Sequence, residues 1–348
     1  MYNNELMKNK IGFIAIGQAG GNIGQLLEKK GYSVLYLNTS KEDLDTIKDV
    51  KYKYHITGGE GCNKDRHKAK KLIVDDFNNI LTKIDDTVKT DMLFVIFSAG
   101  GGTGSGAGPM LVDMLISESR QVGVITIVPA MTESLKTQVN AYECFQELVN
   151  IENCGSCFIL DNEKSKDKLT INAIFVNALC AFLDIPNKYH SKKGNIDIAE
   201  IMESLKAHGM ACVSQFPDTE VAKLVDQDKN IYAPMESDKV IKYITISANE
   251  SLADMQDITT VYGEPWDVFR AYSPKESIML MSGLSYPVNR LDKIHHKVED
   301  NKDSIIKNLS SGMGTSLTGS FDFLTPAKPT EKKVEKVHSR DDIFKKYL

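Results

Sequence analysis

The sequence predicts an α/β fold with a first domain on a mostly parallel sheet, a central helix, a smaller second α/β domain, a C-terminal helix and a flexible tail. The chain has 348 residues, enough for two domains that each bury a core. Hydrophobic residues make up 42% and charged residues 26%, which excludes collagen-like, low-complexity and wholly disordered proteins. Short apolar runs alternate with segments of helical length, as in parallel sheets covered by helices on both faces.

The first domain begins with Ile11–Ile16, a continuous apolar run that ends in a glycine cluster and precedes a helical pattern. Such a run is typical of a buried strand followed by a turn and a helix. The same pattern recurs at Val34–Leu37, Leu93–Phe97, Val122–Val128 and Phe158–Leu160. We expect these runs to form one sheet.

The residues from Ile171 to Ile185 are apolar on nearly every face, which predicts a helix buried on all sides. We expect this central helix to lie between the two domains. The second domain is predicted by a helical pattern at Ile198–His208 and by strands at Met210–Val213, Val240–Ser247 and Ile278–Ser282.

The C-terminal part changes character twice. Asn289–Leu309 is charged with sparse apolar positions, as in an exposed amphipathic helix, and Ser310–Gly319 then breaks all periodicity, as in a flexible linker. The expected boundaries are 1–170 for the first domain, 171–187 for the central helix, 188–288 for the second domain, 289–310 for the C-terminal helix and 311–348 for the tail.

Charge is distributed unevenly along the chain. The formal net charge is −5, and the tail from Lys328 to Leu348 holds seven Lys and Arg against four Asp and Glu, so the tail is +3 and the rest −8. An acidic body disfavours direct contact with DNA. The basic tail is either a solubilising segment or an appendage that finds a partner. Its last residues place Ile343, Phe344 and Tyr347 on one helical face, which favours folding on a partner.

Other features predict a cytoplasmic protein with no direct membrane contact. No apolar run approaches the roughly 18 residues of a membrane-spanning helix, and the start, Met1–Lys10, is polar. The six cysteines are scattered through apolar or loop contexts. A chain of this size has no need of a disulfide framework, so we expect free thiols.

The strongest local signal is Gly100-Gly-Gly-Thr-Gly-Ser-Gly106, which follows the strand Leu93–Phe97 and precedes a helix that we expect to start near Pro109. Glycines let main-chain N–H groups approach an anion closely. Thr103 and Ser105 add hydroxyl donors, and the helix directs the positive end of its dipole to the same point. This pattern predicts a phosphate-binding loop.

Two further loops have the same character. Gly17-Gln-Ala-Gly-Gly-Asn22 follows the first strand, but Ala19 and Asn22 stand where a dinucleotide fingerprint needs glycine. Asn38 replaces the acidic residue that would hold a ribose hydroxyl, which weakens an oxidoreductase hypothesis. Gly58–Arg66 is the third loop. Three such loops at one sheet edge predict a polyphosphate ligand.

Gly100–Gly106 resembles the tubulin/FtsZ signature, and the other loops follow in that family's order, with a particular likeness to the TubZ-like cytoskeletal GTPases of bacterial plasmids and phages. The resemblance implies GTP or GDP bound at the carboxyl ends of the strands, with Mg²⁺ expected but no protein metal ligand assigned. The implied nucleotide-binding residues are Gly17, Gln18, Ala19, Gly20, Gly21, Asn22, Asn38, Gly59, Gly61, Gly100, Gly101, Gly102, Thr103, Gly104, Ser105, Gly106, Glu133 for the ribose, Asn162 for the guanine edge, and Phe175 for stacking on the base. A core position for Phe175 is an equal alternative, because aromatic residues on apolar helices are usually buried.

Gly194–Ile201 is similar to the family's catalytic loop, which reaches the nucleotide of the next subunit in a filament. Asn195, Asp197 and Glu200 match it, and two carboxylates can orient an attacking water. A plain helix start capped by Asn195 or Asp197 is the local alternative, and both roles are compatible.

The sequence therefore predicts a filament-forming GTPase that hydrolyses GTP at the subunit interface. The resemblance implies that it segregates plasmid or phage DNA, with the C-terminal tail contacting a DNA-bound adaptor protein. The alternatives are a non-hydrolysing tubulin-like structural or adaptor protein and, with less support, a Rossmann-type oxidoreductase.

Overall fold

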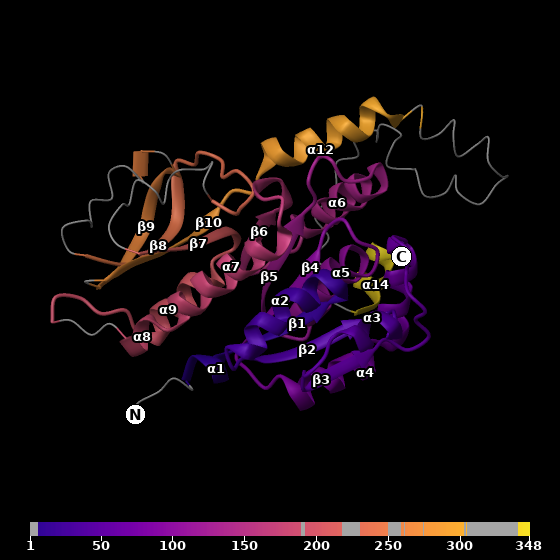
Figure 1. Ribbon diagram of the computed structural model, residues 1–348, viewed down its shortest axis with the longest axis horizontal. Coiled ribbons are helices and arrows are strands. Elements are labelled where there is room, and N and C mark those ends of the chain that lie inside the picture. Colours follow the sequence, from indigo (N-terminus) through magenta and orange to yellow (C-terminus); the bar gives the residue numbers. More distant parts are fainter. Residues whose placement is uncertain are drawn as a thin grey trace.

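The computed structural model describes residues 6–188, 192–217, 230–249, 259–260, 262–273, 275–302, 304 and 340–348. Within them one ten-stranded sheet runs through the molecule in the order β3-β2-β1-β4-β5-β6-β7-β10-β8-β9 (Figure 1). The strands are β1 (Ile11–Ile16), β2 (Ser33–Asn38), β3 (Tyr52–His55), β4 (Met92–Ser98), β5 (Gln121–Val128), β6 (Ser156–Asp161), β7 (Gly209–Pro217), β8 (Val240–Ala248), β9 (Glu264–Tyr272) and β10 (Glu276–Leu284).

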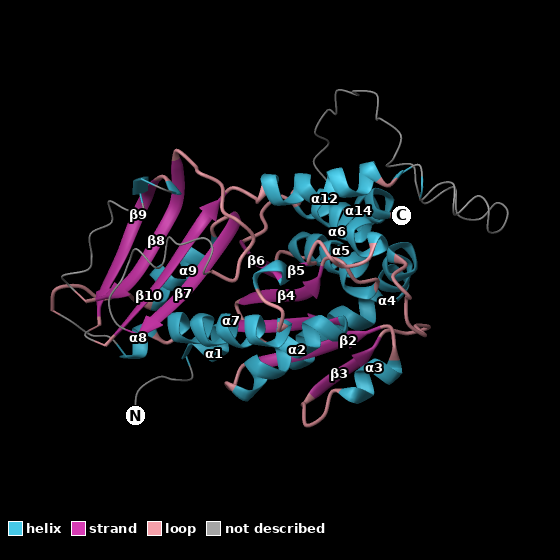
Figure 2. Cartoon of the chain, turned by 45° about the horizontal axis from the view of Figure 1, so that its top comes forward, coloured by secondary structure: helices cyan, strands magenta, loops and turns pink. Residues whose placement is uncertain are grey.

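Helices cover both parts of the sheet (Figure 2). They are α1 (Leu6–Lys10), α2 (Gly17–Lys29), α3 (Lys41–Thr46), α4 (Arg66–Thr87), α5 (Thr103–Ser117), α6 (Leu135–Leu148), α7 (Lys168–Leu183), α8 (Ile185–Lys188), α9 (Ile198–Lys206), α12 (Val288–Asp300) and α14 (Arg340–Tyr347), with a 3-10 turn η1 at Asn162–Lys164. None of the described helices is long and apolar enough to cross a bilayer.

The predicted α/β fold is confirmed. From β3 to β7 every pair of neighbours is parallel, whereas β10 is antiparallel to both β7 and β8. β6 pairs with β7 over Ser156–Phe158, so the second domain continues the sheet of the first. The residue boundaries of the domains stay predictions.

Two strands were not predicted from the sequence, and both lie at edges of the sheet. β3 reads Tyr-Lys-Tyr-His and β9 begins Glu-Pro-Trp-Asp, so neither contains an apolar run. An edge strand has a neighbour on one side only, and charged residues there are common. Their pairing partners, rather than local hydrophobicity, therefore define these strands.

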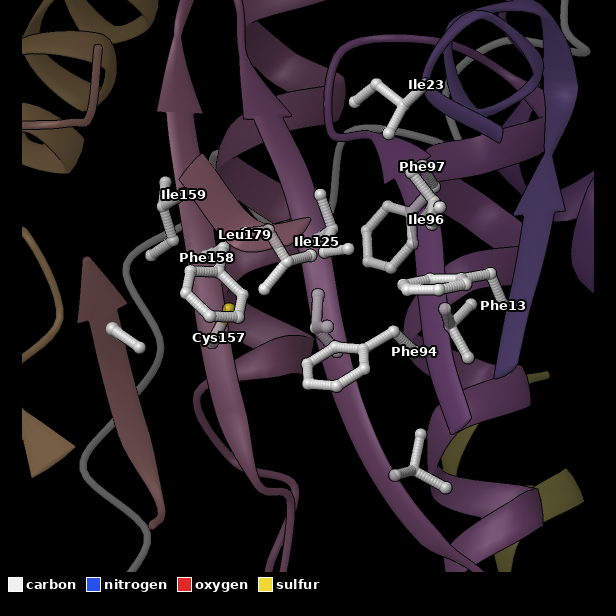
Figure 3. Packing of buried hydrophobic residues seen from close by; sticks show 14 of the residues in the cluster. Phe13, Ile23, Phe94, Ile96, Phe97, Ile125, Cys157, Phe158, Ile159 and Leu179 are labelled. Atoms are coloured by element: carbon white, nitrogen blue, oxygen red, sulfur yellow. The ribbon is translucent and has the colours of Figure 1, made fainter. Parts of the chain in front are cut away.

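The core extends across β1, β4, β6 and α7 (Figure 3). The rings of Phe13 and Phe94 stack with their centroids 6.1 Å apart. Phe94, Phe158 and Phe175 continue the series with centroid distances of 5.9 and 5.4 Å. The expectation that the helix from Ile171 to Ile185 is buried on all sides is wrong at Ile174, which is 49% exposed. Leu169, in the first turn of α7, is 60% exposed.

Helix α5 begins at Thr103, six residues before the expected start near Pro109. A proline inside a helix has no N–H for the carbonyl four residues earlier, here that of Ser105. Arg66 supplies the missing donor, because its Nη2 donates to the Ser105 carbonyl at 3.0 Å. The helix therefore tolerates Pro109 and starts inside the glycine loop.

The C-terminal helix prediction is confirmed for Val288–Asp300. α12 packs on α6 and buries Ile294 and Val298, so it is amphipathic but not exposed on all sides. α14 packs on α5 and buries Ile343 and Tyr347, while Lys346 pairs with Asp113 at 2.7 Å. The linker and most of the tail, residues 305–339, lie outside the described residues.

All six cysteines are free thiols, as expected.

Candidate nucleotide-binding site

The predicted phosphate loops meet at the carboxyl ends of β1, β2 and β4. Parallel strands end on the same edge of a sheet, so the connections after them are neighbours in space. The loop that follows β3 joins them: the Gly61 amide donates to the Thr39 carbonyl at 2.8 Å, and Thr39 Oγ1 lies 3.3 Å from Cys62 Sγ. All three predicted loops thus share one edge.

Two helix N-termini adjoin in this region, and neither has a side-chain cap. α2 follows Ile16 and α5 follows Gly102, with no capping hydrogen bond from either residue. Side chains cap α3, α4, α6, α7 and α9, whereas α12, which follows Pro287, also has no side-chain cap. A β-carbon at Gly17 would lie 3.8 Å from the amide nitrogen of Gly104. The uncapped N–H groups and the two helix dipoles therefore point to one region, an arrangement that suits an anion.

Glycine is required where these loops cross each other. Gly17 has a φ of +70°, which disfavours any other residue. A β-carbon at Gly102 would lie 2.7 Å from the backbone of Lys64, and one at Gly106 would lie 2.5 Å from the Arg66 carbonyl. The main glycine loop therefore packs directly on the start of α4, which keeps its backbone rigid.

Polar side chains also lie at the edge of the sheet where the three predicted phosphate loops meet, here called the phosphate end. Thr39 and Thr103 are hydrogen-bonded through their hydroxyls at 2.7 Å, which ties the end of β2 to the start of α5. Asn38 is 2% exposed, and its Nδ2 has no hydrogen-bond partner among the described residues. A buried amide without a partner costs free energy unless a ligand accepts its hydrogen bond. Asn38 therefore fits a ligand-binding role.

A charged network behind the loops holds them in place. Arg66, 4% exposed, pairs with Glu143 at 2.8 Å and with Glu147 at 2.7 Å, and Lys70 pairs with Glu147 at 2.6 Å. Burial lowers the pKa of Arg66, but the two carboxylates outweigh this effect and raise it. The guanidinium stays charged and links α4, α5 and α6.

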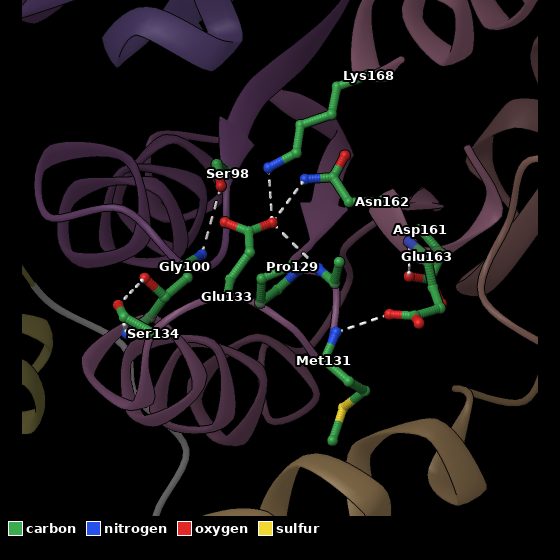
Figure 4. Close-up of polar contacts among 12 residues, drawn as sticks. Ser98, Gly100, Pro129, Met131, Glu133, Ser134, Asp161, Asn162, Glu163 and Lys168 are labelled. Atoms are coloured by element: carbon green, nitrogen blue, oxygen red, sulfur yellow. Dashed lines mark hydrogen bonds and ion pairs between the residues drawn. The ribbon is translucent and has the colours of Figure 1, made fainter. Parts of the chain in front are cut away.

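Glu133 and Asn162 lie together after β5 and β6 (Figure 4). Asn162 Nδ2 donates to Glu133 Oε1 at 3.2 Å, and Lys168 Nζ donates to the same oxygen at 2.8 Å. Burial alone would raise the pKa of Glu133, but the hydrogen bonds from Lys168, the Ala130 amide and Asn162 lower it. This carboxylate is therefore ionised and well oriented.

Phe175 does not reach the surface. Its side chain is 0% exposed, and its ring packs on Phe158 and Tyr232 at centroid distances of 5.4 and 6.4 Å. A ring enclosed by the core has no face open to a base, so the structure corrects the stacking assignment in favour of the core alternative. Leu169, in the first turn of α7 beside Lys168, is the exposed apolar residue there.

Asn195 and Asp197 precede α9, and Glu200 lies in its first turn. Helix α9 lies away from the phosphate loops, near α8 at the far end of α7 (Figures 1 and 2). α7 has 16 residues, so it spans about 24 Å. Asp197 Oδ1 accepts the Glu200 amide at 2.9 Å and Glu200 Oε2 accepts the Asp197 amide at 2.8 Å, which forms a capping box. Asn195 and Asp197 are exposed. Within one molecule these acids cannot reach the phosphate end.

Comparison with known proteins agrees with this geometry. Residues 10–170 match the GTPase domain of the tubulin/FtsZ family. The chain is 30% identical over 305 residues to the tubulin-like protein TubZ of Clostridium botulinum C phage, which covers 84% of each chain. The chain belongs to the tubulin/FtsZ family. The conserved fold extends beyond the GTPase domain, because the crystal structure of phage c-st TubZ matches 85% of this chain and 99% of that one, with a TM-score of 0.76 and 28% identity.

A GTPγS-form protofilament structure of Bacillus thuringiensis serovar israelensis TubZ has the same fold, with a TM-score of 0.72 at 14% identity over 89% of this chain and 97% of that one. The glycine loops lie within residues 10–170, the part of the chain that matches the GTPase domain of the family.

Several residues of this site were not predicted from the sequence. Lys168 is exposed and polar, and nothing in its sequence context indicates that it pairs with Glu133. Asn140 Nδ2 donates to the carbonyls of Gly101 at 2.8 Å and Lys64 at 3.1 Å, bracing the main loop. A polar residue on the buried face of α6 was the available signal. Arg290, on α12, stands in a charged segment, and nothing in its sequence context indicates that it is buried.

No group of three or more His, Cys, Asp or Glu side chains suited to a metal occurs among the described residues. Mg²⁺ usually binds polyphosphates with few protein ligands and several waters. The hydroxyls of Thr39 and Thr103 at the phosphate end are compatible with such an ion.

Proposed function

We propose that this chain is a filament-forming GTPase whose active site is completed by a neighbouring subunit. The main support is that the residues suited to bind phosphate and the acids suited to orient water lie far apart in one molecule. The uncapped helix starts of α2 and α5 suit a triphosphate, whereas the acidic pair Asp197 and Glu200 lies near the other end of α7. Head-to-tail stacking of identical subunits would bring one end of each molecule against the other end of the next.

In this proposal the loops after β1, β2, β3 and β4 hold the phosphates of GTP. Main-chain amides and the Thr103 hydroxyl donate hydrogen bonds, and the α2 and α5 dipoles stabilise the negative charge. The predicted hydroxyl contact of Ser105 is corrected, because Ser105 is 0% exposed and its hydroxyl donates to the Gly101 carbonyl. Mg²⁺ bound to the nucleotide would neutralise charge on the phosphates. Asn162 contacts the guanine edge and Glu133 the ribose, while Leu169 replaces Phe175 as the apolar neighbour of the base.

The acids of the next subunit orient the attacking water. The capping box uses one oxygen of each carboxylate, and the structure gives no partner among the described residues for Asp197 Oδ2 or Glu200 Oε1. Capping and catalysis are therefore compatible: the backbone amides fix both side chains, and the second oxygens remain available for water. Positioning of this kind accounts for most of the catalysis in phosphoryl transfer.

The relatives support self-association, since solved structures of TubZ from Bacillus thuringiensis serovar israelensis include a protofilament, and a two-stranded filament of TubZ-Bt is also known. We extend the proposal to segregation of plasmid or phage DNA in the cytoplasm, with the tail contacting a DNA-bound adaptor protein. The terminal helix α14 is docked on α5 through Ile343 and Tyr347. An adaptor that uses the same apolar face must displace it.

Phosphate release as a function of protein concentration tests the proposal. A site shared between subunits requires a threshold concentration and a steep rise above it, and electron microscopy with GTP should show filaments above the same threshold. Equal turnover per molecule at all dilutions would contradict a shared site. Filaments with GTP but no phosphate release would favour the alternative, a non-hydrolysing structural protein.

A further inference from the structure

Arg290 is a buried charged residue that joins the C-terminal helix to the nucleotide-binding domain. It is 4% exposed and lies on α12, 129 positions after its partner Asp161 at the end of β6. Arg290 Nε donates to Asp161 Oδ2 at 2.7 Å and Nη2 donates to Asp161 Oδ1 at 3.1 Å. This is a bidentate pair, the geometry in which arginine binds a carboxylate most specifically.

The same guanidinium also holds the end of β5. Nη2 donates to the Pro129 carbonyl at 2.8 Å, and Nη1 lies 2.9 Å from Met131 Sδ. Lys297, two turns further along α12, donates to the Met131 carbonyl. One face of α12 therefore contacts both loops that carry the proposed base and sugar ligands.

Asp161 transmits this anchoring to Asn162. Its Oδ1 caps the η1 turn by accepting the Glu163 amide at 2.9 Å. Glu163 Oε2 in turn accepts the Met131 amide at 2.6 Å, and Asn162 bonds to Glu133 at 3.2 Å. Figure 4 shows these contacts, which join the loop after β5 to the loop after β6. Arg290 stabilises both loops, because it bonds to Asp161 and to the Pro129 carbonyl.

The burial of the pair makes this support sensitive to substitution. Asp161 is 1% exposed, so loss of the guanidinium leaves a carboxylate that is neither paired nor hydrated. The η1 turn and the β5 loop would then rearrange. The phosphate loops are held separately, by Asn140 and by Arg66. The rearrangement is therefore confined to the loops after β5 and β6, which carry the proposed ligands of the base and the ribose.

We infer that Arg290 is a positioning residue for guanine recognition, which fixes Asn162 and Glu133 in the geometry that the base and the ribose require. This inference rests on the proposed function, because it assumes that a guanine nucleotide occupies the site. It assigns to the C-terminal helix a part in nucleotide selectivity, in addition to its packing on α6.

The test compares Arg290→Met and Arg290→Lys with the matched control Lys293→Met, all in the full chain. Lys293 is exposed on the same helix, and the structure gives it no contact with either loop among the described residues. The affinities for GTP, ATP and inorganic tripolyphosphate are measured by competition. We expect Arg290→Met to reduce the preference for GTP over ATP about tenfold, about 1.4 kcal/mol, with tripolyphosphate affinity unchanged. Arg290→Lys keeps the positive charge but cannot form the bidentate pair with Asp161, so it should lose part of the preference for GTP over ATP.

The outcomes separate the inference from the proposed function. A wild-type chain without preference for GTP over ATP would overturn both. A wild-type preference that survives in both Arg290 variants would overturn the positioning role alone. Equal loss of affinity for GTP, ATP and tripolyphosphate would show a general scaffold role and would also overturn it. If Arg290→Met does not fold, Arg290→Lys and Asp161→Asn decide the question with the same three ligands.

Discussion

Replacement of Asp197 by asparagine separates catalysis from helix capping. Asparagine is as good an N-cap as aspartate, so Asp197→Asn keeps the hydrogen bond from the Glu200 amide and the start of α9. It removes only the negative charge of the carboxylate. If the acid orients the attacking water in the next subunit, its loss should reduce the turnover rate by about 100-fold, the low end for a positioned general base.

The comparison with Asp197→Ala sharpens this test. Alanine removes both the charge and the cap, so it should reduce turnover as Asp197→Asn does and also lower the free energy of unfolding by about 1 kcal/mol. Phosphate release is measured above the polymerisation threshold, and chemical denaturation gives the stability. Glu200→Gln is the corresponding variant for the second acid, since glutamine retains the capping box.

One result would refute the reasoning. If Asp197→Asn forms filaments and releases phosphate at the wild-type rate, while Asp197→Ala is merely less stable, the residue is only a cap. The capping alternative would then explain the motif completely.

Three further predictions follow from the site and the terminal helix. The pKa of Glu133 is lowered in the folded protein. Its ionised carboxylate therefore stabilises the fold above its ordinary pKa, and this stabilisation is lost as the pH falls through the lowered value. Glu133→Gln should remove this part of the pH dependence of the free energy of unfolding, measured by denaturation at several pH values. Arg66→Met removes the donor of Glu143 and of the Ser105 carbonyl and one of the two partners of Glu147. GTP affinity should therefore fall about tenfold or more by equilibrium titration, and unchanged affinity would refute the bracing role. Ile343→Asp should release α14 and speed amide hydrogen exchange over residues 340–347, whereas the exposed Lys345→Ala should not.

The positions of the apolar strands along the chain and the main glycine loop were predictable, because both depend on local sequence. A buried strand such as Ile11–Ile16 needs a continuous apolar run, and Gly100–Gly106 needs glycines wherever another backbone approaches. The edge strands β3 and β9 were not predictable in this way, since their pairing rather than their composition defines them. Helix α5 starts earlier than expected because Arg66, distant in sequence, compensates for Pro109.

Side chains that act across the fold were the least predictable part of the site. Phe175 could be a core residue or a ligand on the evidence of its helix, and only its contacts with Phe158 and Tyr232 decide for the core. Lys168, Asn140 and Arg290 obtain their roles from partners that are 35, 76 and 129 positions away in the sequence.

By itself, the sequence determined the α/β class, the family and the loops that suit a polyphosphate, because glycine spacing and apolar runs impose local constraints on the backbone. Only the tertiary structure decided which helix starts lack caps, which residues brace the loops and which acids lie beyond the reach of their own nucleotide site. These properties depend on distances between segments far apart in the chain, and a linear pattern contains no such distances.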